Sequence, residues 1–242
     1  MNKLILKIKR KFESKTKAAE KIKNIRIACK ITDECFSHIL RFSKIGQTEI
    51  QIADEIKRFL LAKGAEDLSF PTIAVSGKRG SLIHGIPSSK KIQKGDFLTL
   101  DFGCKINGYC SDMTRTIAFN TISDKQKELY FIVLNAQEAA TKKIKVNQSC
   151  FELDKIARDM IKKYGYGENY IHGTGHGITK EIHAAPTINQ KSKEFLKTGD
   201  IITIEPGIYI ENEFGLRIED SILVTEAGFE ILTKSSKKLI ML

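Results

Sequence analysis

Residues 97–119, FLTLDFGCKINGYCSDMTRTIAF, decide the fold of this chain because they predict a β-hairpin. At its centre is Asn107-Gly108, the dipeptide best suited to a two-residue type I′ turn, whose two central residues both need a positive φ. Placing Ile106 opposite Tyr109 then fixes the register of the two strands. The face that we expect to pack against a core carries Leu100, Phe102 and Met113.

The same register brings two carboxylates together. Asp101 faces Thr114 and Gly103 faces Asp112, so the two aspartates are diagonal neighbours on one face. Diagonal Cα atoms lie about 7–8 Å apart and the side-chain tips lie closer, which suits hard cations. The alternative is that Asp101 merely ends a strand and that Asp112 is a surface partner of Arg115. The hairpin alone leaves both interpretations open.

Composition predicts a globular protein of one domain. Of the 242 residues, 41% are hydrophobic and 29% are charged, and no apolar run approaches the roughly 18 residues that cross a bilayer. The apolar run at the amino terminus is too short for a signal peptide, so we expect a cytoplasmic protein. The five cysteines are odd in number and form no C-x-x-C pair, which predicts free thiols rather than disulfides or a zinc knuckle.

The positive charge gathers at the amino terminus. Residues 1–30 hold eleven Lys or Arg against two Glu, whereas the whole chain has a net charge of +11. We divide the chain into a basic leader (1–14) and a single globular domain (15–242). Such a leader could contact nucleic acid or a ribosome, but no aromatic-rich surface accompanies it, and a solvated helix start is the favoured interpretation.

Helices and strands are expected to alternate in the same order twice. A helix is predicted over residues 20–42, and a Thr48/Gln51 capping box opens a second one that ends near Gly64. Strands follow at 70–75, near Ile83 and in the hairpin. Two more helices begin at Ser123/Gln126 and at Ser149/Glu152, the last ending at Gly165. The halves are therefore about 15–120 and 121–242.

A local sequence repeat supports this division. GDFLTLDFG (95–103) aligns with GDIITIEPG (199–207) at a constant offset of 104 residues, so Asp101 is matched by Glu205. Each half also has a His-x-x-Pro segment, starting at His84 and at His183. An internal duplication predicts two similar structural units. Here it pairs carboxylate with carboxylate and histidine with histidine.

Glu205 leads into a second predicted hairpin. A three-residue loop at 211–213 would set Glu219 opposite Glu205 on one face. The alternative is that Glu219 is a surface carboxylate paired with Arg217. Between the halves lies IHGTGHG (171–177), whose three glycines allow His172 and His176 to approach a crowded centre.

Two aspartates, two glutamates and one imidazole form an oxygen-rich donor set. This set suits Mn²⁺, Fe²⁺, Co²⁺ or Zn²⁺ in a two-metal centre, whereas a structural zinc site would use thiolates and histidines. Two such ions lower the pKa of a shared water and polarise a carbonyl oxygen. Both effects are needed to hydrolyse an amide.

With these motifs in order, the chain from about residue 15 to 242 resembles the pita-bread metallopeptidases, the family of methionine aminopeptidase, aminopeptidase P and prolidase. The resemblance implies an α+β pita-bread fold, with two pseudo-symmetric helix-helix-sheet halves around a dinuclear metal site. The implied metal ligands are Asp101, Asp112, His176, Glu205 and Glu219, of which Asp112 and Glu219 bridge. The implied catalytic residues are Glu205, which handles the proton of the attacking water, and His84, His183 and His172. The implied substrate-binding residues are His84, His183, Tyr209 and Arg217.

The motifs favour the Xaa-Pro branch of this family. HGTGHG, TIEPGIY (203–209) and GLRIED (215–220) resemble aminopeptidase P and prolidase, and Glu219 follows Glu205 by 14 residues, fewer than in methionine aminopeptidases. His84-Gly-Ile-Pro instead resembles methionine aminopeptidase, which is the alternative function. Thr179-Lys180 departs from the Gly-Leu that is usual there.

The resemblance also carries expectations about cofactors and partners. We expect two divalent ions, with Mn²⁺ first, a peptide substrate, and a homodimer that replaces the amino-terminal domain for which this chain has no room. A non-catalytic binding module of the same fold is disfavoured, because such modules lose metal ligands and all five are present here.

Overall fold

The computed structural model describes the backbone of residues 3–242 and the side chains from Thr16 onward. In the first half, α1 (Lys3–Phe42) and α2 (Glu49–Ala62) precede β1 (Asp67–Leu68), β2 (Ile73–Ser76), the 3-10 helix η1 (Gly77–Ser81), β3 (Phe97–Phe102), β4 (Cys104–Ile106), β5 (Tyr109–Cys110) and β6 (Met113–Ala118). In the second half, α3 (Asp124–Thr141) and α4 (Cys150–Lys163) precede η2 (Gly167–Asn169), β7 (Gly175–Gly177), β8 (Ala184–Ile188), β9 (Ile201–Ile204), β10 (Gly207–Ile210), β11 (Phe214–Arg217), β12 (Asp220–Thr225) and β13 (Gly228–Ile231). The order helix, helix, strands thus occurs twice, as expected.

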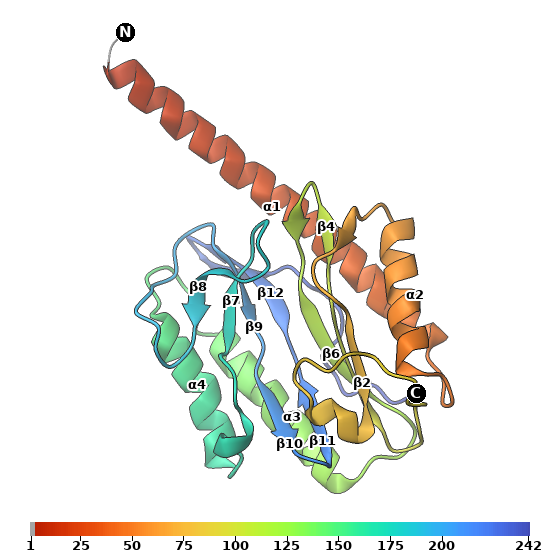
Figure 1. The fold of residues 1–242 in the computed structure, drawn as a ribbon. Coiled ribbons are helices and arrows are strands. Elements are labelled where there is room, and N and C mark those ends of the chain that lie inside the picture. The colour runs from red at the N-terminus through yellow and green to blue at the C-terminus, as the bar shows by residue number, and fades with distance from the viewer. Residues whose placement is uncertain (1–2) are drawn as a thin grey trace.

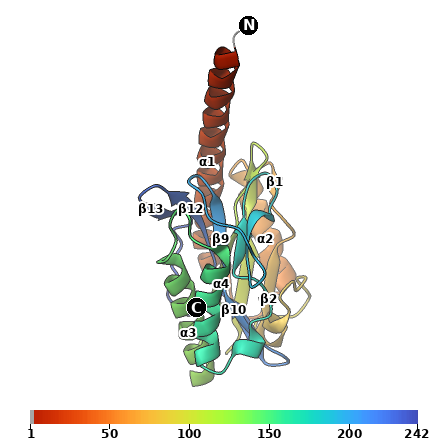
Figure 2. The same cartoon turned by 90° about the vertical axis from the view of Figure 1, so that its left-hand side faces the viewer.

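Helix α1 is longer than the predicted 20–42 segment. It begins at Lys3 and continues without interruption to Phe42. Its amino-terminal part projects beyond the rest of the molecule, at the top of both views (Figure 1, Figure 2). The interpretation of the leader as a solvated helix start concerns side chains before Thr16, which lie outside the described residues. Within residues 3–242, no helix combines the length and apolarity needed to cross a membrane.

The predicted helix starts are confirmed by their capping bonds. Thr48 and Gln51 form a reciprocal capping box at α2, and Ser123 and Gln126 form one at α3. At α4 the Ser149 hydroxyl accepts a hydrogen bond from the Glu152 amide at 3.3 Å. These bonds satisfy amide groups that would otherwise lack partners in the first helical turn.

The first hairpin has the predicted register. Asn107 and Gly108 have φ of 50° and 76°, Ile106 pairs with Tyr109, and Asp101 pairs with Thr114. The ladder is interrupted between β3 and β4 at Gly103, where a Cβ would lie 1.9 Å from the carbonyl oxygen of Ser111. Only glycine therefore allows the two chains to approach so closely beside the aspartates. β2, β3 and β6 form one sheet, and β1, β4 and β5 form another.

The predicted strand near Ile83 is wrong. η1 and an irregular loop take its place, and the strand before them begins at Ile73 rather than at residue 70. The loop is held by the carboxylate of Glu49, which is fully buried and accepts hydrogen bonds from Ser88 and from Arg79 of η1. A side chain of α2 thus satisfies polar groups that a neighbouring strand would otherwise satisfy.

The second hairpin also has the predicted register, but it is divided between two sheets. Ile210 pairs with Phe214 in the β10–β11 ribbon, and Ile204 pairs with Asp220 in the sheet ordered β13-β12-β9-β7-β8. Glu205 and Glu219 lie at the break between these sheets. Pro206 contributes to the break because it has no amide proton to donate to a ladder.

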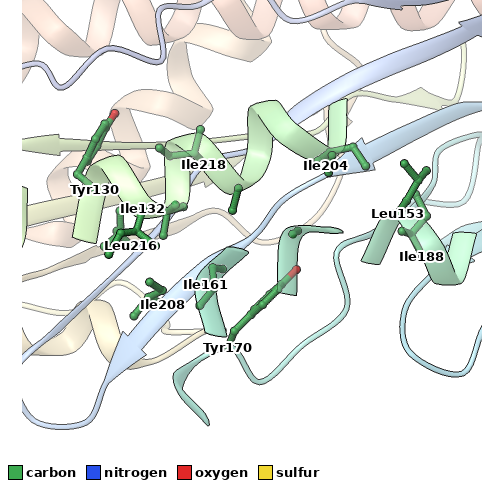
Figure 3. Close-up of a cluster of buried hydrophobic side chains, with 14 of the residues drawn as sticks. Tyr130, Ile132, Leu153, Ile161, Tyr170, Ile188, Ile204, Ile208, Leu216 and Ile218 are labelled. Carbon is green, nitrogen blue, oxygen red and sulfur yellow. The ribbon is translucent and has the colours of Figure 1, made fainter. Parts of the chain in front are cut away.

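The strands lie between two layers of helices, with α1 and α2 on one side and α3 and α4 on the other (Figure 1). One hydrophobic core packs α3 and α4 against β9, β10 and β11 (Figure 3). Its labelled members include Tyr130, Ile132, Leu153, Ile161, Ile204, Ile208 and Leu216. A second core lies under α1 and α2 and includes Leu100, Phe102 and Met113, the face of the first hairpin expected to be buried. All five cysteines are free and buried, as predicted.

Candidate metal centre

The predicted site residues meet in one cavity between the two halves. The five predicted metal ligands come from β3 (Asp101), the segment before β6 (Asp112), β7 (His176) and the break in the second hairpin (Glu205 and Glu219). The cavity has a volume of about 650 Å³. It is also lined by His84, His172, His183 and Arg217, while Tyr209 contacts two of its lining residues.

Three of the predicted ligands are close enough to share one ion. Asp112, His176 and Glu219 each offer a ligand atom, and these atoms lie within 4.8 Å of one another. His176 Nε2 lies 3.3 Å from Glu205 Oε1 and 3.7 Å from Asp112 Oδ2. Glu205 therefore adjoins the cluster, and Asp101 faces the same cavity from the first hairpin.

Both surface alternatives for the carboxylates are wrong. Asp112 is 4% exposed, and Arg115 instead forms an ion pair with Asp220 at 2.7 Å. Glu219 is 1% exposed and accepts a hydrogen bond from the Thr114 hydroxyl at 2.7 Å. Several carboxylates are thus gathered out of water with few cations to compensate them, which is costly unless an ion is supplied.

The electrostatics of the cluster reflect this crowding. Burial raises the pKa of Asp112 and of Glu219 well above the ordinary carboxyl value, and the neighbouring carboxylates raise both further. Burial also acts to raise the pKa of Glu205, but the hydrogen bond and charge of His176 outweigh it and lower that pKa to about 2. Mutual repulsion between carboxylates in a buried space is what bound cations relieve.

Unpartnered oxygen atoms support the same conclusion. Within the described part of the chain, Asp101 Oδ1 and Asp112 Oδ1 are buried without a hydrogen-bond partner. His176 Nδ1 lies 3.2 Å from the carbonyl oxygen of Gly177, to which it donates. In the metal-free protein His176 Nε2 carries a proton that faces Glu205. Once this proton leaves, the Nε2 lone pair faces the carboxylates, which is the arrangement of a metal-binding imidazole. The residues present therefore fit divalent cations.

A hydrogen-bonded chain connects Asp101 to the loop before β7. Arg217 Nη2 donates to Asp101 Oδ2 and its Nη1 donates to the Tyr209 hydroxyl, both at 2.6 Å. The Tyr209 hydroxyl lies 2.9 Å from His172 Nε2, and His172 Nδ1 lies 2.7 Å from the carbonyl oxygen of Gly173.

The direction of each proton in this chain follows from the partners. Burial lowers the pKa of His172 to about 4 and raises that of Tyr209 to about 12, so both side chains are neutral near pH 7. A carbonyl oxygen can only accept, so His172 Nδ1 carries the proton. Tyr209 therefore donates to His172 Nε2 while it accepts from Arg217.

The repeated histidines enter the cavity from loops of the two halves. The ring of His183 lies edge-on to that of His176, with centroids 4.5 Å apart, and His84 lies on the loop after η1. Burial and the positive charge of His176 lower the pKa of His183. A neutral imidazole can present an N–H group to a substrate.

Sequence reasoning missed two threonines of the site. Thr114 donates to Glu219 and accepts from Arg217 Nε at 3.1 Å. Thr203 donates to Glu205 at 3.1 Å and accepts from the His176 amide at 3.0 Å. A signal was available, because each threonine lies two residues from a carboxylate in a predicted strand and therefore on the same face.

Sequence reasoning also missed the apolar wall of the cavity, to which Phe70, Pro71, Ile73, Ile83 and Ile86 contribute. No periodic signal marks this wall, since most of its residues lie in irregular backbone. Ile86 is 81% exposed, so it lies at the open edge of the cavity.

Comparisons with known proteins show which proteins this chain is similar to. The model of metallopeptidase family M24 matches residues 23–226. An Xaa-Pro dipeptidase of Pyrococcus furiosus is 43% identical over 224 residues, which cover 93% of this chain and 64% of the relative. An uncharacterized peptidase of Bacillus subtilis is 45% identical, with the same coverage of both chains.

Solved structures are equally similar. An Xaa-Pro dipeptidase from Bacillus anthracis has a TM-score of 0.91 at 48% identity, covering 92% of this chain and 63% of that one. An X-Pro aminopeptidase from Thermotoga maritima has a TM-score of 0.90 at 38% identity, covering 93% and 64%. This chain therefore spans a little under two thirds of the length of these relatives. Its α+β architecture is the pita-bread fold of its structural neighbours, and the chain belongs to metallopeptidase family M24.

Proposed function

We propose that this chain is a metal-dependent exopeptidase that hydrolyses the peptide bond between an amino-terminal residue and proline. The observation that carries the proposal is the convergence of four carboxylates and His176 on one cavity, with two buried carboxylate oxygens that lack partners. The names of the relatives, Xaa-Pro dipeptidase and X-Pro aminopeptidase, favour this specificity over removal of an initiator methionine.

In this proposal Asp101, Asp112, His176, Glu205 and Glu219 would hold two divalent ions. The donor set is rich in oxygen, which favours Mn²⁺ and also accommodates Co²⁺, Fe²⁺ or Zn²⁺. When bound there, two divalent cations supply a Lewis acid for the scissile carbonyl and acidify the attacking water.

The side chains of the cavity supply the remaining chemistry. Glu205, ionised over the physiological range because of its low pKa, accepts the proton of the attacking water and passes it to the leaving amine. His84 and His183 donate hydrogen bonds to the carbonyl oxygen as negative charge develops on it. His172, Tyr209 and Arg217 position the substrate, and Arg217 also supports Asp101 and Tyr209 through hydrogen bonds.

The test is cleavage of three peptides, monitored by mass spectrometry with Mn²⁺-loaded protein and a chelated control. We expect Ala-Pro-Gly-Gly or the dipeptide Ala-Pro to be cleaved and Met-Ala-Ser-Gly to remain intact. Cleavage of the tetrapeptide Ala-Pro-Gly-Gly without cleavage of the dipeptide would indicate an aminopeptidase, and the reverse would indicate a dipeptidase. Cleavage of the methionine peptide alone would overturn the proposed specificity.

A matched pair of variants distinguishes cleavage at the proposed site from cleavage by a contaminating peptidase. Asp112→Asn removes a proposed bridging ligand without changing its size, whereas Asp124→Asn changes an exposed residue of α3. The first variant should lose cleavage and the second should retain it. Equal activity in both would contradict the proposed site.

We also propose that the protein works in the cytoplasm as a homodimer. Five free thiols are typical of a reducing compartment. A second copy would cover the open edge of the cavity, where Ile86 is exposed. Light scattering that shows only monomer at micromolar concentration would contradict the dimer.

A further inference from the structure

Two charged residues of α4 lie outside the catalytic cavity yet are bonded to the backbone that carries its residues. Asp154 is fully buried, and the Arg158 side chain is 16% exposed. One helical turn apart, they form a bidentate pair, with Arg158 Nε 2.9 Å from Asp154 Oδ2 and Nη2 3.0 Å from Oδ1. Both also bond to residues 170–174, the loop that leads into β7.

The first set of bonds runs from Asp154 to Glu205. Asp154 Oδ1 accepts from the Thr174 amide at 3.1 Å and from the Thr174 hydroxyl at 2.9 Å. The carbonyl oxygen of Thr174 in turn accepts from the Glu205 amide at 2.8 Å. Because the Thr174 hydroxyl donates to Asp154, it must accept from the Tyr170 hydroxyl, which lies 2.7 Å away. The backbone that bears Glu205 is thereby fixed relative to α4.

The second set runs from Arg158 to Asp101. Arg158 Nη1 donates to the carbonyl oxygen of Tyr170 and Nη2 to that of His172, both at 2.8 Å. The ring of His172 continues through Tyr209 and Arg217 to Asp101. The backbone of His172 determines where its ring lies. By bonding that backbone, Arg158 therefore influences the position of Asp101 at the other end of the chain of hydrogen bonds.

The loop needs such support because its own sequence gives it little stiffness. Glycine occupies positions 173, 175 and 177 around Thr174 and His176, and glycine restricts the backbone less than any other residue. Every guanidinium nitrogen of Arg158 is engaged, and its guanidinium carbon lies 4.3 Å from the centre of the Tyr170 ring. Four of the five N–H groups of Arg158 thus bond Asp154 or the backbone of the 170–174 loop.

We infer that Asp154 and Arg158 are positioning residues that hold the 170–174 loop and, through it, set the placement of Glu205 and Asp101. This inference rests on the proposed function only in treating Glu205 and Asp101 as metal ligands. Partners that orient ligands from outside the coordination sphere are worth about 10–100-fold in metal affinity or activity. Loss of the pair should therefore weaken metal binding without removing a ligand.

The test compares the parent protein with Arg158→Met, which keeps most of the packing on Tyr170 and removes the bonds to Asp154, Tyr170 and His172. Titration calorimetry of the metal-free protein with Mn²⁺ should show about tenfold weaker binding of at least one ion. Hydrogen exchange of the metal-free variant should be faster at the amides of Thr174 and Glu205. Arg158→Lys should recover only part of each effect, because a single ammonium cannot reach all three partners.

Two control variants of the same helix separate positioning from general stability. Ile161→Ala removes a buried side chain from the α4 core and should lower the melting temperature while Mn²⁺ affinity stays unchanged. Lys155→Met removes an exposed ion pair with Asp159, also at i,i+4 spacing, and should change neither property.

The inference is overturned if Arg158→Met binds Mn²⁺ with the affinity of the parent. It is also overturned if Ile161→Ala, at the same loss of melting temperature as Arg158→Met, weakens Mn²⁺ binding by the same factor. Neither readout requires turnover. A parent protein that binds Mn²⁺ but cleaves no peptide would thus contradict the proposed function and leave this inference standing. If the parent binds no Mn²⁺, unchanged exchange at the Glu205 amide in Arg158→Met overturns the inference.

Discussion

Arg217 Nη2 lies 2.6 Å from Asp101 Oδ2, and this ion pair joins the two halves of the molecule inside the cavity of the candidate metal centre. Arg217 is 3% exposed, and its Nη1 and Nε atoms donate to the hydroxyl groups of Tyr209 and Thr114. The resemblance to known peptidases implied that Arg217 binds substrate. That role stays a prediction, and the contacts of Arg217 also hold Asp101 and Tyr209 in place at the edge of the cavity.

Replacing Arg217 should therefore destabilise the metal-free protein. In Arg217→Met the carboxylate of Asp101 loses its cation, and breaking a buried ion pair costs about 3–5 kcal/mol. Urea unfolding of the metal-free protein measures this loss. Arg58→Met is the control, because the Arg58 side chain is 63% exposed beside Glu55 and solvent-exposed ion pairs contribute little to stability. Equal stability of the two variants would contradict a structural role for the Arg217–Asp101 pair.

Removing one proposed ligand charge should abolish tight metal binding. Glu219→Gln keeps the size of the side chain and the acceptor for Thr114, but it removes one negative charge from the cluster. Loss of a residue that orients a ligand already lowers metal affinity about 10–100-fold. Loss of a ligand itself should therefore lower Mn²⁺ affinity at least about 100-fold. Calorimetric titration with Mn²⁺ measures the change. The control is Glu138→Gln, an exposed residue of α3, which should bind Mn²⁺ as the parent does. If Glu219→Gln also bound Mn²⁺ like the parent, the metal centre would have to lie elsewhere.

The stability of the metal-free protein should depend on pH with a definite sign. The pKa values of Asp112 and Glu219 are raised in the folded state, mainly by burial. Above the ordinary carboxyl pKa of about 4, the folded protein then holds protons that the unfolded chain has released. Its stability should fall as pH rises through the raised values. Glu205 has the opposite shift, to about 2, so its contribution is lost only below about pH 4.5.

Thermal melts from pH 5 to 8, with and without saturating Mn²⁺, test this sign. The metal-free protein should melt at lower temperature as pH rises, and Mn²⁺ should stabilise it most at the upper end. Glu219→Gln should flatten the slope of the metal-free series. A slope in Glu219→Gln equal to that of the parent would contradict protonation of Glu219 in the fold, because the opposing contribution of His172, whose pKa is lowered to about 4, is present in both proteins.

Gly175 should tolerate no side chain. A Cβ there would lie 2.0 Å from the carbonyl oxygen of Thr203, where β7 approaches β9 beside His176 and Glu205. Overpacking costs about 1–3 kcal/mol and sometimes more, and the backbone atom in contact cannot rotate away. Gly175→Ala should therefore lower both stability and Mn²⁺ affinity, as measured by urea unfolding and calorimetry.

Gly199→Ala is the control for Gly175→Ala. It introduces a methyl group in open space at a φ of +87°, so a loss of about 1–2 kcal/mol from backbone strain and no loss of metal affinity are expected. Metal affinity that falls equally in both variants would mean that the contact with Thr203 does not determine where His176 lies.

Local patterns in the sequence were sufficient for much of the fold. Asn107-Gly108 fixed the register of the first hairpin, because only one turn type suits that dipeptide, and the side-chain period of two then placed Asp101 and Asp112 on one face. The capping residues Thr48 and Ser123 marked where helices begin, because a side chain must satisfy the first free amides. These features depend on neighbours a few residues away.

The loop around His84 was misread for the opposite reason. Its conformation is set by Glu49, 35 residues earlier in the chain, whose carboxylate is buried among donors that no local pattern identifies. The apolar wall of the cavity was missed likewise, because irregular backbone has no period that could reveal which side chains face inward.

The sequence by itself determined which residues could form a metal centre, because the repeat at 104 residues pairs Asp101 with Glu205 and His84 with His183 whatever their environment. Only the tertiary structure decided the pKa values of these residues and the contacts that hold them in place. Burial raises the pKa of Asp112 and Glu219, the Arg217–Asp101 pair crosses between the halves, and the Asp154–Arg158 pair reaches the centre through the 170–174 loop. These properties arise from contacts between residues far apart in the chain, since desolvation and charge depend on distance in space and not on separation in sequence.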